Sequence, residues 1–499
     1  MSLTSRKALA RNSLINLAGF ALPLLVGLIA IPPILRGLGI ERFGVLTLAW
    51  ALIGYFSLFD LGIGRAITQS MAARLGVASA REVSRLTWTG LQLMLVFSLI
   101  GAAIVASLSP WFVSAVLNMP PALRDETVDA FILLAAAIPA VVSSAGLAGV
   151  LAALQRFDLI NALRIPMGMA VFLVPLAVLP YSDNMAHICA GLLIVRVLFL
   201  VLHAAACFHA YPPLRRHIGI ERSEIKGLLS FGGWLTVTNV IGPLMVYVDR
   251  FVISAALGIS AVAYYVTPYE MVTRLWAIPA AVVTVLFPAF SAARGGSAGH
   301  AAILYSMGGR GILCILSPIV LVLTVFAEEG LTIWLGSDFS QQSAAVLQWL
   351  AIGVYLNSYA QIPFAFIQGL GRADITAKLH ILELPVYIAL MFWLLNVYGI
   401  IGVAIAWLLR IAIDAALLTV VAHWLSKDTA LASRQIAPFL AIPLALFAIG
   451  LTLDGTAVKV VFTGLAFLAI FAVAYYSASP GEKSAIRKAS RRFSTNRLP

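Results

Sequence analysis

The sequence contains few charged residues and very few cysteines. Of its 499 residues, 11% are charged and 61% are hydrophobic, a balance that a soluble globular domain does not need. Cys189, Cys207 and Cys314 lie in apolar stretches without a C-x-x-C pair, which argues against a disulfide framework or a zinc site. The sequence also lacks a glycine-rich phosphate loop with its lysine. We therefore expect no cofactor and no direct use of ATP.

Long apolar segments are what the sequence does contain. A transmembrane helix needs about 20 mostly apolar residues. We therefore expect an all-α polytopic membrane protein with about fourteen transmembrane helices. The first segment is too long for the apolar part of a signal peptide, so we expect it to be retained. The expected spans are 13–35, 43–64, 87–108, 128–152, 158–180, 186–209, 228–256, 262–290, 301–327, 343–368, 378–397, 400–424, 436–453 and 457–477.

The positions of the basic residues predict the orientation of these helices. If both termini are cytoplasmic, most of the 33 Lys and Arg residues fall in cytoplasmic connections or in the C-terminal tail. The positive-inside rule therefore predicts a multi-pass protein of the bacterial inner membrane with both termini in the cytoplasm. This topology and the anionic lipid of the inner leaflet account for the net charge of +12, so nucleic-acid binding is not indicated.

The expected connections are short. The longest one outside runs from about 109 to 127, and the longest ones inside from about 65 to 86 and from about 210 to 227. None is long enough to fold as a separate domain. A membrane enzyme of glycan assembly generally needs a sizeable external loop that carries its catalytic groups. The short loops therefore disfavour an enzyme.

An internal repeat organises the chain. Three landmarks of the first half recur in the second half, in the same order and at nearly the same separation. Six expected helices, an even number, separate the copies, so the two halves share one orientation in the membrane. The paired landmarks are Leu-Gly-Ile at 38–40 and 257–259, the segments 154–159 and 370–375, and Arg196 and Arg410.

The repeat predicts two parallel six-helix lobes around a central cavity. We expect an N-terminal lobe at 1–210 and a C-terminal lobe at 228–425, joined by a cytoplasmic linker at 211–227. Two extra transmembrane helices follow at 426–477, and a basic cytoplasmic tail occupies 478–499. Alternating access would operate at the cavity between the lobes.

Five short motifs carry a family resemblance. They read NSLIN at 12–16, ILRGLGIERFG at 34–44, FDLGIGRA at 59–66, VDRFVI at 248–253 and IQGLGR at 367–372. In these motifs the chain resembles the multidrug/oligosaccharidyl-lipid/polysaccharide exporter superfamily, and within it the bacterial polysaccharide-flippase or O-antigen translocase branch. The resemblance covers the first twelve expected helices.

The resemblance implies a transporter. Its expected substrate is an undecaprenyl-diphosphate-linked oligosaccharide, the repeat unit of an O-antigen, capsule or exopolysaccharide, which crosses the inner membrane. Its expected partners are this glycan, membrane lipid and, as candidates, a polysaccharide polymerase and the chain-length machinery. Two alternatives remain open: a cation-coupled multidrug exporter of the same superfamily, and a polymerase or ligase of glycan assembly.

Five arginines interrupt the expected spans, where a guanidinium is costly unless it meets water, a partner or an anion. We expect Arg196 and Arg410 to bind the diphosphate, because a guanidinium pairs bidentately with phosphate oxygens. Alternatively, Arg410 pairs with Asp414 one turn later. The position that matches Asp414 in the first copy is Leu200, so Arg196 has no local partner. We expect Arg310 to reach the membrane interface.

Two more groups of polar residues are candidates. Asp249, Arg250, Glu270 and Arg274 lie at similar depth on either side of a turn near Ser260. They form either a structural charge network or a gate or head-group site. Asp60 and Glu383 are candidate sites for a coupling ion or proton, and Asp60 alternatively fixes the end of a helix. Tyr355 and Tyr359 form either a sugar-binding face or part of the packing.

Overall fold

The computed structural model describes residues 6–60, 62–292 and 298–477. Helices make up most of these ranges, which contain no strand. The expected all-α class is therefore confirmed. The chain divides into two compact units, Met1–Val266 and Thr267–Pro499. The boundaries predicted from the repeat, at 210 and 228, remain a prediction, and the tail at 478–499 lies outside the described residues.

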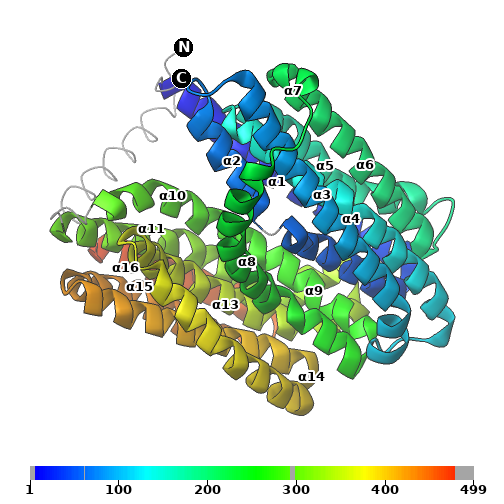
Figure 1. Cartoon of the computed structure of the whole chain (residues 1–499). Coiled ribbons are helices and arrows are strands. Elements are labelled where there is room, and N and C mark those ends of the chain that lie inside the picture. The colour runs from blue at the N-terminus through cyan, green and yellow to red at the C-terminus, as the bar shows by residue number, and fades with distance from the viewer. Residues whose placement is uncertain (1–5, 61, 293–297, 478–499) are drawn as a thin grey trace, which may run out of the picture. The chain divides into compact units, whose positions relative to one another are not determined.

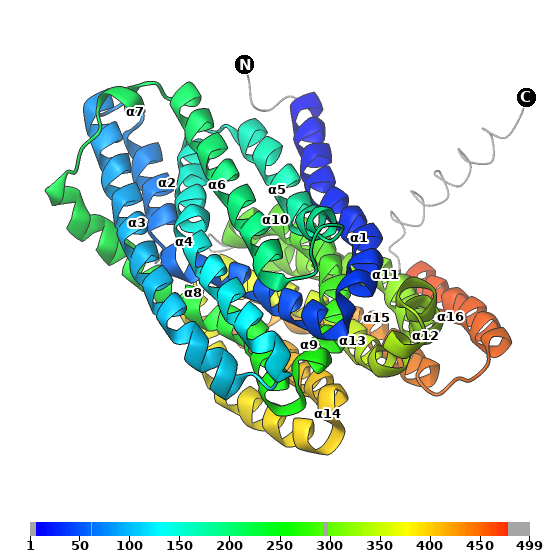
Figure 2. The same cartoon turned by 90° about the vertical axis from the view of Figure 1, so that its right-hand side faces the viewer.

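The helices of the first unit pack around α4 (Arg124–Ala153). This helix is buried over much of its surface because α3 (Ala80–Trp111) and α6 (Met185–Ala210) contact it along their lengths, and the three run side by side in Figure 2. An apolar helix without a polar face is expected at such a central position. The unit also contains α1 (Arg6–Tyr55), η1 (Phe56–Asp60), α2 (Ile63–Arg74), η2 (Phe112–Val116), η3 (Pro121–Leu123), α5 (Phe157–Val178), α7 (Pro213–Arg216) and α8 (Arg222–Leu257).

The helices of the second unit pack around α13 (Ser337–Gly369), which contacts α10 (Ala277–Ala292), α11 (Ala298–Val325), α12 (Ala327–Leu335) and α14 (Ala373–Leu425). Helices α15 (Asp428–Gly450) and α16 (Thr456–Ser477) pack mainly against α11. Figure 1 shows α14 folding back on itself as two long antiparallel halves. The remaining bounds are α9 (Ile259–Thr273), which crosses the division between the units, and η4 (Arg274–Trp276).

The number of transmembrane helices is not confirmed as fourteen. Within the described residues, 11 helices are long and apolar enough to cross a membrane. Helix α14 contains two expected spans, and α1 contains the first expected span and part of the second. A glycine with a positive φ separates the two parts, Gly39 at 73° and Gly399 at 59°. Glycine adopts this region without the steric cost that a Cβ imposes.

The second expected span, 43–64, does not continue as one helix. Helix α1 ends at Tyr55, η1 follows, and α2 begins at Ile63 after Gly62, which has a φ of 72°. Helix α2 then packs on α4, because the Thr68 hydroxyl bonds to the carbonyls of both Gly64 and Gly149 at 3.0 Å. Apolar composition alone did not reveal this break.

One landmark of the repeat folds alike in both copies. After α4, the Arg156 amide donates to the Leu151 carbonyl at 2.9 Å, and after α13, the Arg372 amide donates to the Ile367 carbonyl at 3.1 Å. This hydrogen bond is typical of a helix end at which the residue before the donor has a left-handed backbone conformation. That residue is Gln155 (φ 59°) in the first copy and Gly371 (φ 76°) in the second. In each copy the arginine then pairs with an aspartate two residues later.

The turn of α14 predicts which substitution the second unit will not tolerate. A Cβ at Gly402 would collide with the Leu394 carbonyl on the other side of the turn, whereas a Cβ at Gly464 in α16 would meet nothing within 4 Å. We expect Gly402→Val to destabilise the protein by about 1–3 kcal/mol, the usual cost of overpacking. Melting temperatures of the purified variants test this, with Gly464→Val as the matched control. Equal melting temperatures would contradict the close contact.

Candidate functional site

A cluster of ionisable side chains lies between the two halves of α14. His380 and Glu383 project from the first half, and Arg410 and Asp414 from the second. The Arg410 Nε lies 3.9 Å from Glu383 Oε2, and the His380 Nε2 lies 3.6 Å from Asp414 Oδ1. Glu383 and Asp414 are only 5% and 4% exposed. The turn at Gly399 therefore brings four ionisable groups into one buried site.

The cluster has more acceptors than donors. Both carboxylate oxygens of Glu383 and the Oδ1 of Asp414 are buried without a hydrogen-bond partner among the described residues, and the 3.6 and 3.9 Å contacts are too long for hydrogen bonds. The cluster thus holds two carboxylates, one guanidinium and one imidazole. A buried excess of negative charge is unfavourable in a membrane protein. A proton or a cation would neutralise it.

The donor set is compatible with a small cation. One ligand atom each from His380, Glu383 and Asp414 lie within 4.8 Å of one another. Carboxylate oxygens suit hard cations, and an imidazole nitrogen suits transition metals. From the sequence, Glu383 and Asp414 are candidates and no metal is expected, whereas His380 is not among the candidates. The i,i+3 spacing from His380 to Glu383, which puts both on one helix face, was an available signal.

Arg410 does not pair with Asp414 within the described part of the chain. Its ion-pair partner is Glu383 from the opposite half of α14, and its guanidinium also lies 5.9 Å from the centre of the Tyr387 ring. Asp414 instead lies beside His380, whose ring stacks on Phe364 at 5.8 Å. These contacts favour Glu383 over Asp414 as the partner of Arg410, because the neighbouring half of the helix supplies the nearer carboxylate.

Arg196 lies on the packed face of α6. It follows Leu192 by one turn and precedes Phe199 and His203, all three of which are buried, while Ile194 on another face is 68% exposed. The Arg196 side chain is half-buried. Within the described residues, its guanidinium forms no hydrogen bond and no ion pair. This agrees with its lack of a partner in the local sequence.

Asp249 and Arg250 are buried in α8, each 1% exposed. Asp249 accepts hydrogen bonds from the Tyr265 hydroxyl and from the Arg250 amide, both at 2.8 Å. The Arg250 guanidinium lies 4.6 Å from the centre of the Tyr247 ring, a cation–π distance. Both residues are thus held by neighbours within the first unit.

Glu270 and Arg274 pair with each other in the second unit. The Arg274 Nη2 lies 3.3 Å from Glu270 Oε2, and both side chains are about 40% exposed, as their i,i+4 spacing predicts. Because these two residues and the Asp249–Arg250 pair belong to different units, a network of all four remains a prediction.

Asp60 holds the start of a helix. Its Oδ1 accepts a hydrogen bond from the Gly64 amide at 2.7 Å, in the first turn of α2. This contact satisfies one of the amides that a helix N-terminus leaves free. The contact favours the alternative in which Asp60 fixes a helix end over a coupling role.

Tyr355 and Tyr359 are buried between helices of the second unit. The Tyr355 hydroxyl donates to the Phe439 carbonyl of α15 and bonds to Ser317 of α11 at 3.0 Å. The Tyr359 hydroxyl bonds to Thr419 of α14 at 2.9 Å. The sequence left open whether these tyrosines form a sugar-binding face or part of the packing. Their contacts favour packing.

Arg310 bonds within the protein. Its Nη1 donates to the Ser477 carbonyl, the last residue of α16, at 3.0 Å. A guanidinium there interacts favourably with the negative end of the helix dipole. The reach of Arg310 toward the membrane interface stays a prediction, and the structure adds this specific helix contact.

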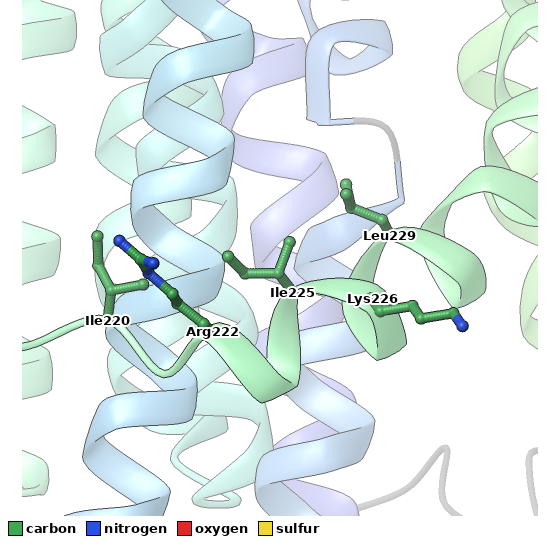
Figure 3. A pocket seen from close by; sticks show the side chains of 5 residues that line it. All are labelled: Ile220, Arg222, Ile225, Lys226 and Leu229. Atoms are coloured by element: carbon green, nitrogen blue, oxygen red, sulfur yellow. The ribbon is translucent and has the colours of Figure 1, made fainter.

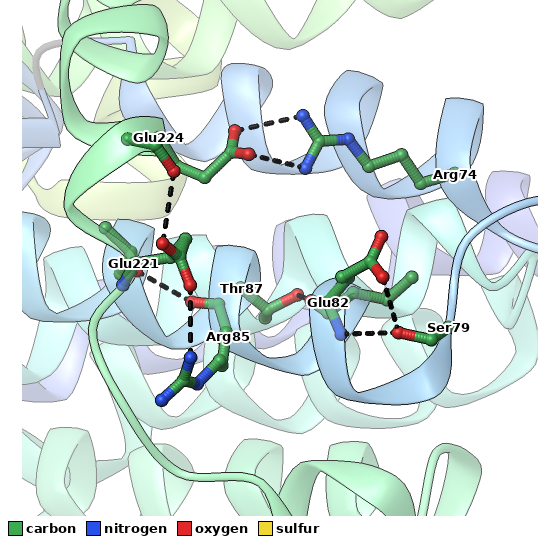
Figure 4. Close-up of polar contacts among 10 residues, drawn as sticks. Arg74, Ser79, Glu82, Arg85, Thr87, Glu221 and Glu224 are labelled. Carbon is green, nitrogen blue, oxygen red and sulfur yellow. Dashed lines mark hydrogen bonds and ion pairs between the residues drawn. The ribbon is translucent and has the colours of Figure 1, made fainter.

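The start of α8 carries a second set of charges, which are not among the candidates from the sequence. Figure 3 shows a pocket there lined by Ile220, Arg222, Ile225, Lys226 and Leu229. Figure 4 shows that Arg74 of α2 binds both carboxylate oxygens of Glu224, at 2.8 and 3.0 Å. Arg85 of α3 binds Glu221 at 3.2 Å. Two ion pairs therefore fasten the first turn of α8 to α2 and α3.

Comparisons with known proteins agree with this architecture. The family described as "Polysaccharide biosynthesis protein" matches residues 9–294. A protein of Shigella flexneri described as "Putative O-antigen transporter" is 31% identical over 411 residues, which are 82% of this chain and 97% of that protein.

Two solved structures share the fold. A lipid II flippase, MurJ in an inward closed conformation, superposes with a TM-score of 0.70 at 14% identity, over 94% of this chain and 99% of that one. An inward-facing multidrug resistance transporter of the MATE family superposes with a TM-score of 0.65 at 14% identity, over 85% and 98%. At these identities the match establishes the fold alone.

The buried cluster predicts non-additive effects on stability. Arg410→Ala leaves two carboxylates buried without their cation, a loss of about 3–5 kcal/mol, and Glu383→Gln removes one of these carboxylates. We expect the double variant to lose less than the sum of the single losses. Melting temperatures of all three variants test this. The control is the exposed pair Glu270 and Arg274, substituted in the same way, for which the losses of stability should be nearly additive. Additive losses of stability in the cluster would contradict the coupling.

Proposed function

Because the chain belongs to the polysaccharide biosynthesis protein family, we propose that it is a flippase for a lipid-linked oligosaccharide. The substrate would be an undecaprenyl-diphosphate-linked repeat unit, which moves from the inner to the outer leaflet of the bacterial inner membrane. The observation that carries this proposal is the 31% identity to the relative described as "Putative O-antigen transporter". The match covers 97% of the length of that relative. The protein is a transporter and not an enzyme.

The charges of the substrate suit the arginines of the membrane helices. A diphosphate carries clustered negative charge, and a guanidinium offers a planar fork for its oxygens. Arg196 supports a binding role because no carboxylate holds it in the described residues. Arg410 supports one because its contact with Glu383 is long, at 3.9 Å. Arg250 and Arg274 are weaker candidates, since a tyrosine ring and Glu270, respectively, already contact them.

The α14 cluster supports a coupling mechanism. Arg410 can face Glu383 or a phosphate, but its single charge cannot neutralise both. When the diphosphate takes Arg410, Glu383 loses its counter-charge and binds a proton or a cation with Asp414 and His380. When the proton or cation leaves, Glu383 reclaims Arg410 and the diphosphate is released. Substrate and coupling ion would thus be linked through one guanidinium.

The side of the membrane on which each connection lies is part of the proposal. The excess of basic residues in alternate connections supports cytoplasmic termini. A polysaccharide polymerase and the chain-length machinery are proposed partners because they act on the product in the outer leaflet. The two six-helix lobes of the repeat would then be the moving parts.

Complementation of a deletion strain tests the substrate. The deletion should retain lipid-linked repeat units on the cytoplasmic face, and the wild-type gene should restore surface glycan. We expect Arg196→Ala and Arg410→Ala each to reduce surface glycan at least tenfold, because each removes a charge-assisted contact of about 1.5–3 kcal/mol. Surface glycan is measured by gel electrophoresis and immunoblotting.

The matched control is Arg372→Ala, which removes an exposed arginine from the turn after α13. It should complement fully at equal protein level. Full complementation by both Arg196→Ala and Arg410→Ala would overturn their binding role. A deletion that alters only drug sensitivity would favour a multidrug exporter, and repeat units exposed outside but unprocessed would favour an assembly enzyme.

The coupling proposal predicts how pH changes binding. As pH falls, Glu383 is protonated and releases Arg410, so the wild-type protein should bind a polyprenyl diphosphate more tightly. Glu383→Gln frees Arg410 at every pH, so we expect binding about tenfold tighter than wild type at high pH and nearly independent of pH. Titration of the lipid into nanodiscs containing the protein measures this.

The control for this experiment is Glu328→Gln, which removes an exposed carboxyl group from α12 in the same unit. It should keep the wild-type affinity and pH dependence. Weaker binding by Glu383→Gln, or an unchanged pH dependence, would show that Glu383 and the diphosphate do not compete for Arg410.

A further inference from the structure

The first turns of α8 separate their charges by face. Glu221 and Glu224 are turned toward α3 and α2, where Arg85 and Arg74 bind them. Arg222 and Lys226, one turn apart, are both exposed. In the described part of the chain, neither basic group forms an ion pair or a side-chain hydrogen bond. The acids are thus neutralised by the protein, and two positive charges remain available.

Apolar side chains lie beside these two charges. Ile220, Ile225 and Leu229 line the same pocket, which has a volume of about 710 Å³. In Figure 3 the side chains of Ile225 and Leu229 rise from one side of α8, and Arg222 lies next to Ile220. Ile220 is 54% exposed and Leu229 is 37% exposed. The pocket therefore combines apolar side chains with two basic ones.

The length of α8 is compatible with a pocket at the membrane surface. The helix has 36 residues, which at 1.5 Å per residue makes it about 54 Å long. The hydrocarbon core of a bilayer is about 30 Å thick. The helix is therefore long enough to span this core while its first two turns, which carry Arg222 and Lys226, lie at the level of the lipid head groups.

We propose that this pocket binds the head group of an anionic phospholipid of the phosphatidylglycerol class. Arg222 and Lys226 contact the phosphate, and Ile225 and Leu229 contact the first part of an acyl chain. Basic residues at a cytoplasmic membrane surface attract anionic lipid in this way. The apolar side chains that line the pocket favour a membrane-resident lipid over a soluble phosphate compound. The site is separate from the arginines assigned to the transported substrate, and its existence does not depend on the proposed function.

The bound lipid would act on the contacts of α8. The same helical turn carries Glu224, which Arg74 binds on the opposite face. A lipid on one face and two ion pairs on the other together restrain the start of α8. Anionic lipid thus stabilises the position of the segment that leads from the first repeat into the second.

Native mass spectrometry of the detergent-solubilised full chain tests this site. Phosphatidylglycerol or phosphatidylcholine is titrated into the protein, and the dissociation constant of the first bound lipid is measured. We expect the wild-type protein to prefer phosphatidylglycerol. Because each basic residue near a membrane contributes to anionic-lipid binding, Arg222→Gln with Lys226→Gln should weaken phosphatidylglycerol binding about tenfold and leave phosphatidylcholine binding unchanged.

The matched control is the pair Arg81→Gln and Lys378→Gln, which removes the same charge from exposed positions outside the pocket. It should keep the wild-type preference. An equal loss in this control, or no loss in the pocket variant, would overturn the proposal. The proposal would also be overturned if polyprenyl diphosphate, at a concentration lower than that of phosphatidylglycerol, displaced the bound phosphatidylglycerol. The pocket would then belong to the transported substrate. Should the pocket variant fail to fold, Leu229→Gln, which keeps both charges, should still lose affinity.

Discussion

The compensation of buried charge is the constraint on which the interior of this membrane protein depends. Between the halves of α14, Glu383 and Asp414 are almost fully buried, and their ionic contacts, to Arg410 and to His380 respectively, are long. Elsewhere the same problem is solved within the fold: Tyr265 and the Arg250 amide bind Asp249, and the Gly64 amide binds Asp60. Hydrogen bonds compensate the carboxylates of Asp249 and Asp60. In the α14 cluster, by contrast, carboxylate oxygens of Glu383 and Asp414 have no hydrogen-bond partner among the described residues, so this site retains the capacity to bind something else.

The sequence predicted the fold class and most helices because a bilayer imposes one simple requirement, a long apolar segment whose backbone bonds are internal. It also predicted the landmark at 154–159 and 370–375, whose two copies close their helices alike. It did not predict the break after Tyr55. Gly62 and Asp60 act there through local backbone geometry, which the mean hydropathy of a segment does not reflect. Helix ends in an apolar chain are set by single residues.

The contacts of the candidate site were less predictable. Spacing along one helix correctly paired Glu270 with Arg274, but it also suggested Asp414 for Arg410. The true partner lies on the other half of α14, and only the turn at Gly399 brings it close. Glu383 and Asp414 are nearly equidistant from that glycine in the sequence, so the turn, once recognised, would have indicated their proximity. Tyr355 shows the opposite case, since the sequence cannot reveal that α15 covers its hydroxyl.

The tight turn at Gly399 has a mechanical consequence. The two halves of α14 are connected without a loop, and Gly402 lies against the Leu394 carbonyl, so neither half can slide along the other without breaking that contact. The contact therefore opposes sliding of one half along the other. With the two halves held in this way, rotation of the Arg410 and Glu383 side chains is the simplest route to a change in their separation, and the cluster would travel with the hairpin until its charges are altered.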